Sequence, residues 1–101
     1  MSTFLITFRI HDNATYSERY NSLVERIKKE GPWWGDTTSF FAVSSEKTTH
    51  DLIYALYYDT LLSSTTDLLV VVNRDFKSSY YVGNLRDSDI KTLLPEIKSL
   101  T

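Results

Sequence analysis

The stretch that decides the fold is Phe4 to Ile27, FLITFRIHDNATYSERYNSLVERI, because the spacing of its apolar residues changes along it. Over residues 4–10, large apolar side chains stand at every second position and so lie on one side of an extended chain. This period of two predicts a strand. From Tyr16 onward the apolar residues recur every three to four positions, which predicts an amphipathic helix that ends at Gly31. The chain therefore begins as a strand followed by a helix.

Two threonines are expected to begin helices. Thr15 stands three residues before Glu18, the spacing of a capping box, and predicts the start of the first helix. Thr48 stands three residues before Asp51 in the same way and predicts a second helix over about residues 49–62.

The remaining segments read as strands and one more helix. Two apolar runs flank Gly35 and Asp36, so we expect a short strand at 33–34 and a second at 38–44, or one long bent strand. Further strands are expected at 68–73 and 77–83. A last helix is expected after Asp87, which is its predicted N-cap, with Pro95 kinking or ending it.

The resulting order is β-α-β-β-α-β, followed by an extra strand and a short C-terminal helix. This order predicts an α+β protein of the ferredoxin-like type, with an antiparallel sheet and both main helices on one face. A chain of 101 residues suits a single domain over residues 1–101, with a core at about 4–83 and a C-terminal extension at about 84–101.

Composition excludes several classes of protein. The chain has no cysteine, so thiolate catalysis and cysteine-ligated zinc are ruled out. The net charge is −2, whereas proteins that bind nucleic acid through its phosphates usually carry a basic excess. No apolar run is long enough to span a bilayer, and no basic segment precedes the first strand, so we expect a cytoplasmic protein without a membrane partner. No cofactor motif is recognisable.

The strand Leu68 to Val72 is apolar at every position, so both of its faces call for burial. Two helices on one face leave the second face uncovered, and a large exposed apolar surface is rare on monomers. Either the C-terminal segment folds back over it or a second copy covers it, and we favour a homodimer. The aromatic residues expected at such an interface are Trp33, Trp34, Tyr80 and Tyr81.

Four segments together resemble one known family: FLITFRI, YSERYNSLVERIKKEG, PWWGDTTSFFAVSSE and HDLIYALYYDTLLSSTTDLLVVV, within residues 4–72. They are similar to the small CRISPR-associated endonuclease of the spacer-adaptation complex, and more closely to its standalone SinR-like relatives. The resemblance implies a homodimer whose sheets face each other. It also implies, in the nuclease members, a metal-binding Asp near the end of the first strand.

In this chain Arg9 stands where that Asp would be. A guanidinium is always cationic and repels a divalent metal, so no metal and no metal-dependent cleavage are expected here. Arg9 would instead form an ion pair with Asp36, Asp75 or a carboxylate of a second copy, or hold an anion. If the chain were a nuclease after all, His11 and Asp12 would be its candidate catalytic residues.

A possible nucleic-acid strip consists of Arg74, Lys77 and Arg86, which are interleaved with aromatic residues. Taken together, the sequence favours a non-enzymatic homodimer that acts through contacts with protein or nucleic acid. The alternatives are an endonuclease, toxin-like or of the CRISPR-associated type, and a regulatory domain that binds a small anion near Arg9.

Overall fold

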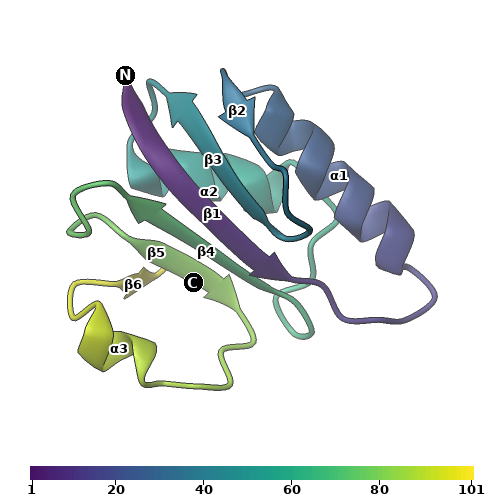
Figure 1. Cartoon of the computed structure of the whole chain (residues 1–101). Helices are drawn as coiled ribbons and strands as arrows, with labels where there is room; N and C mark the ends of the chain where they lie inside the picture. Colours follow the sequence, from purple (N-terminus) through teal and green to yellow (C-terminus); the bar gives the residue numbers. More distant parts are fainter.

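The computed structural model, which describes residues 1–101, is an α+β fold with one six-stranded mixed sheet and three helices (Figure 1). The strands are β1 (Ser2–Arg9), β2 (Trp33–Trp34), β3 (Phe40–Ser45), β4 (Leu68–Asn73), β5 (Tyr80–Gly83) and β6 (Lys98–Ser99). The helices are α1 (Tyr16–Lys28), α2 (Thr49–Tyr58) and α3 (Ile90–Leu93).

The strands lie in the order β2-β3-β1-β4-β5-β6, so the N-terminal strand is central. Every neighbouring pair is antiparallel except β5 and β6, which are parallel. The predicted strands all pair antiparallel, and the one parallel pair involves β6, a strand that was not predicted. The sequence gives no sign of β6 because two residues, Lys98 and Ser99, are too few to show an alternating pattern.

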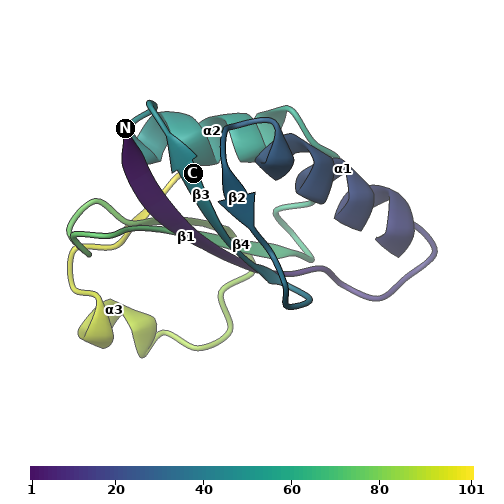
Figure 2. The ribbon, with the colours of Figure 1, turned by 45° about the horizontal axis from the view of Figure 1, so that its top comes forward.

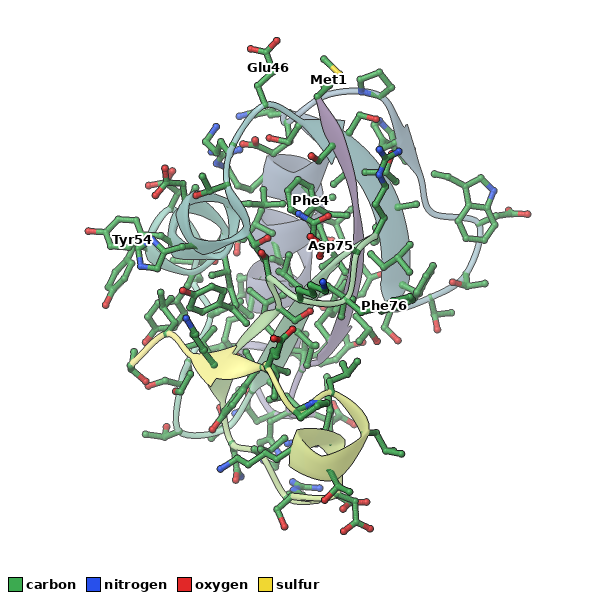
Figure 3. The ribbon with its side chains drawn as sticks, turned by 90° about the vertical axis from the view of Figure 1, so that its left-hand side faces the viewer. Met1, Phe4, Glu46, Tyr54, Asp75 and Phe76 are labelled. Atoms are coloured by element: carbon green, nitrogen blue, oxygen red, sulfur yellow. The ribbon has the colours of Figure 1, made fainter.

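Helices α1 and α2 lie together on one side of the sheet, and α3 lies on the other (Figure 2). The core fills the space between the sheet and the first two helices. Figure 3 shows Phe4 pointing into it, while Tyr54 points outward from α2. The fully buried core side chains come from both layers: Phe4, Ile6, Leu23, Ile27, Val43, Leu52, Ile53, Leu56, Leu69, Val71 and Val82.

We call the side of the sheet opposite α1 and α2 the open face. Residues paired across neighbouring strands point to the same side, and Leu5 pairs with both Ala42 and Val72. These residues alternate with the buried core positions, so they lie on the open face. The C-terminal segment covers only part of this face, over β4, where Val70 is 5% exposed.

The two expected helix caps differ in outcome. Thr48 caps α2 as predicted, because its hydroxyl accepts a hydrogen bond of 3.1 Å from the backbone N–H of Asp51. The capping box at Thr15 is wrong. The Thr15 hydroxyl instead accepts from the Nε–H of Arg19, and Glu18 is exposed.

The boundaries of the later elements also differ from the prediction. Helix α2 ends at Tyr58, earlier than expected, and β5 begins only at Tyr80. Helix α3 is a single turn whose N-cap is Asp89 rather than Asp87, and it ends at Leu93, two residues before Pro95. None of the three helices combines the length and the apolar composition that a membrane span requires.

Candidate functional site

Arg9 is the last residue of β1, and its side chain lies on the open face, since Arg9 shares that side with Leu5. One of its terminal nitrogens, Nη2, donates a hydrogen bond of 2.6 Å to the carbonyl oxygen of Asn84. Its Nε–H is buried and meets no acceptor. The predicted ion pairs with Asp36 and Asp75 are not formed, because no carboxylate of the chain lies within 4.0 Å of Arg9.

The register explains why Asp75 is out of reach. Asp75 lies in the turn between β4 and β5 (Figure 3), next to Arg74, whose N–H bonds to the carbonyl oxygen of Thr3. Thr3 and Arg9 are at opposite ends of β1, about 20 Å apart at the usual rise of a strand.

The strongest polar cluster joins α1 to the loop before β4 and was not predicted. Arg19 and Asp67 form an ion pair with side chains that are 6% and 2% exposed. Asp67 also accepts hydrogen bonds from the backbone N–H groups of His11, at 2.9 Å, and Ser63, at 3.0 Å. The other Arg19 donors reach Thr15 and the oxygens of the 11–13 loop, so both charges are saturated.

Burial raises the pKa of Asp67, but the hydrogen bonds that its carboxylate accepts outweigh this effect and hold the pKa below its ordinary value. Arg19 is the strongest of these donors. Because the pair is buried and fully bonded, its role is to fix the loop that follows β1. One signal could have revealed it: Arg19 lies four residues before Leu23 and eight before Ile27, on the buried stripe of α1.

His11 and Asp12 lie in this loop and are both exposed. The buried pair holds His11 only through its backbone, and neither the imidazole nor the Asp12 carboxylate makes a hydrogen bond within the chain. The two candidate catalytic residues are neighbours in the sequence, but no third polar group bonds to their side chains and orients them.

The position of Arg9 does not fit a divalent metal. The chain contains no group of three or more His, Asp or Glu side chains close enough to hold one. The only charged side chain of β1 is that of Arg9, and its guanidinium on the open face repels a cation.

The four predicted interface aromatics are divided between the two sides of the sheet. Trp34 and Tyr81 lie on the open face, because they pair with Ala42 and Val70. Trp33 and Tyr80 lie on the helix side. There Trp33 carries the ammonium group of Lys28 over its ring at 4.5 Å. Adjacent residues of a strand point to opposite faces, so no such pair of neighbours shares one surface.

The three residues of the predicted nucleic-acid strip are exposed but are not brought together. Arg74 and Lys77 lie in the turn that joins β4 to β5. Arg86 follows the other end of β5 and lines a groove with Arg9. The length of β5 therefore separates Arg86 from the other two residues.

An apolar surface without a helix over it extends across β2, β3, β1 and β4 on the open face. We call it the uncovered patch; it consists of Leu5, Trp34, Phe40, Ala42 and Val72. The Trp34 ring is 49% exposed and packs edge-on against Phe40 with ring centres 6.3 Å apart. The C-terminal segment faces β4 across a groove and pairs with the edge of β5 through β6, and none of its residues lines the groove together with a residue of this patch.

Compared with protein-family models, with curated proteins and with solved structures, the chain matches none of them. The resemblance to the CRISPR-associated family accordingly stays a prediction from sequence pattern.

Proposed function

We propose that this chain is a non-enzymatic ferredoxin-like protein that acts as a homodimer, with the uncovered patches of two copies packed against each other. The observation that carries the proposal is the patch itself: apolar side chains on the open face of the sheet with no helix over them.

Strand order supports the ferredoxin-like part of the proposal. The first four strands of the chain lie in the order β2-β3-β1-β4 and pair antiparallel, and α1 and α2 lie on one face of the sheet. Such an order is that of the split βαβ arrangement. It is also the arrangement that the resemblance to the standalone SinR-like relatives implies.

The exposure of the patch supports the dimer. Exposed apolar patches on soluble chains mark sites of association, and a two-fold pair is the commonest way to close one. A twisted antiparallel sheet can pack face to face against the same face of a second sheet. The C-terminal segment offers no alternative cover for Leu5, Phe40 or Ala42, because it lies at the other edge of the sheet.

The proposal that the chain is not an enzyme rests on Arg9, which stands where the resemblance places a metal-binding Asp. A cytoplasmic location is also part of this proposal. Contacts with nucleic acid have weaker support, because Arg86 lies apart from Arg74 and Lys77.

Sedimentation velocity of the intact chain tests the dimer. We expect a dimer that dissociates on dilution, and a monomer at the same concentrations for Ala42→Lys, which puts a charge in the middle of the patch. Asn21→Lys is the matched control, since it adds the same charge at an exposed position of α1. A wild-type chain that stays monomeric at high concentration, or an Ala42→Lys variant that dimerises like Asn21→Lys, contradicts the proposal.

A further inference from the structure

A second feature of the open face lies apart from the uncovered patch. It is a groove of about 390 Å³ between the sheet and the C-terminal segment, which we call the α3 groove. Leu68 and Val70 of β4 form its floor together with Thr7 and Arg9 of β1. Leu85, Ile90 and Leu93 of the C-terminal segment line the opposite wall.

Arg9 forms no ion pair within the chain. Three of the five arginines are not exposed, and the other two of these have carboxylate partners: Arg19 pairs with Asp67, and Arg26 pairs with Glu30 and Asp59. Arg9 has only the carbonyl oxygen of Asn84, which carries no net charge. A half-buried cation beside aliphatic side chains is costly without a counter-ion, so this position favours an anion.

We infer that the α3 groove binds a small monocarboxylate with an aliphatic chain. The carboxylate would lie against the guanidinium of Arg9, whose remaining N–H donors match its two oxygens. The chain would lie along Leu68, Val70 and Leu93, and would cover Leu93, which is 78% exposed. The volume is within the range of small-molecule sites.

The other charged residues of the groove argue for a single negative charge on the ligand rather than a phosphate. Arg86 lines the groove, but so do Asp87 and Asp89, and all three are exposed. The Asp87 side chain accepts the backbone N–H of Asp89 at 3.0 Å and forms no ion pair. Two carboxylates near one half-buried cation repel a dianion more than a monoanion.

Titration of the ¹⁵N-labelled chain with sodium octanoate tests the inference. We expect saturable shifts of the amide signals of residues 7–9, 68–70 and 85–93. Arg9→Gln should weaken the apparent affinity by about tenfold or more, which is the loss of one charged hydrogen-bonded contact. Arg74→Gln is the matched control, because it removes the same charge from an exposed position at the other end of β1. It should change the affinity by less than about twofold.

Four further measurements sharpen the test. Octan-1-ol has the same chain without the charge and should bind more weakly, and inorganic phosphate should not displace octanoate. If Arg9→Gln does not fold, Arg9→Lys keeps the charge but lacks the planar fork, and it should still weaken binding. Ala42→Lys should bind octanoate like the wild type, which separates this inference from the dimer.

The inference is overturned by any of four results. The first is the absence of saturable octanoate binding up to a few millimolar, a concentration that corresponds to a binding free energy of about −4 kcal/mol. The others are equal affinity for octan-1-ol, displacement of octanoate by phosphate, and an unchanged affinity in the folded Arg9 variant.

Discussion

The buried pair of Arg19 and Asp67 supports a quantitative prediction about the loop after β1. Replacing Arg19 by Met keeps an unbranched side chain of similar helix propensity but removes the charge and four hydrogen bonds. The carboxylate of Asp67, which is 2% exposed, is then left without its ionic partner. Breaking a buried pair in this way costs about 3–5 kcal/mol.

Urea unfolding followed by far-UV circular dichroism at pH 7 measures this loss. The protein concentration must be held fixed, because association adds to the apparent stability. Arg74→Met is the control, since it removes an exposed arginine and should change the free energy of unfolding by no more than about 0.5 kcal/mol.

A second substitution in the Arg19→Met background identifies the cause of the loss. Asp67→Asn removes the unpaired charge but keeps an oxygen that accepts a backbone N–H, so it should restore part of the stability. The reasoning is refuted if Arg19→Met costs less than about 1 kcal/mol, or if Asp67→Asn only adds a further loss.

Three other predictions concern a glycine, a helix cap and the pH dependence of stability. Gly83→Ala should destabilise the fold by more than the roughly 1–3 kcal/mol of backbone strain alone, because Gly83 has a φ of +121° and an added Cβ would lie 2.0 Å from the carbonyl oxygen of Asp67; a Tm equal to that of the wild type would contradict this. Thr48→Ala should cost about 1 kcal/mol in urea unfolding through loss of the α2 cap, and Thr37→Ala, at an exposed threonine outside any helix, should cost clearly less. Burial raises the pKa of Glu30, but hydrogen bonds from Lys47, Ser45 and Arg26 outweigh it and hold this pKa below its ordinary value. The free energy of unfolding should therefore fall as the pH drops from the ordinary carboxyl pKa toward the lower pKa values of folded Asp67 and Glu30, because the unfolded chain binds more protons there; stability that is unchanged or rises on acidification in that range would contradict it.

The pattern of the apolar residues, alternating in β1, helical in α1 and continuous in β4, was sufficient to predict the main elements. Strand β4 was predicted with its observed bounds, and β1 and α1 to within a few residues. These segments succeed because each buries one face against the same core, so local pattern and tertiary packing agree. Strand β6 fails because its pairing with β5 depends on where the C-terminal segment returns, which no local pattern records.

The polar part of the structure was harder to predict for a different reason. Thr15 and Thr48 have the same spacing to an acidic residue, yet only Thr48 caps a helix, because Arg19 occupies the Thr15 hydroxyl. The choice depends on Asp67, which is 48 residues from Arg19 in sequence. Likewise, alternation placed Arg9 away from Phe4, but its missing carboxylate partner follows from the three-dimensional position of Asp75.

Two copies packed through the uncovered patch are most directly detected by isotope-filtered nuclear Overhauser spectroscopy on a mixture of labelled and unlabelled chains. The proposal predicts contacts between the methyl groups of Leu5 and Ala42 in one copy and protons of the other copy. A spectrum in which these methyl groups show contacts only within their own chain, at concentrations near millimolar, would contradict it.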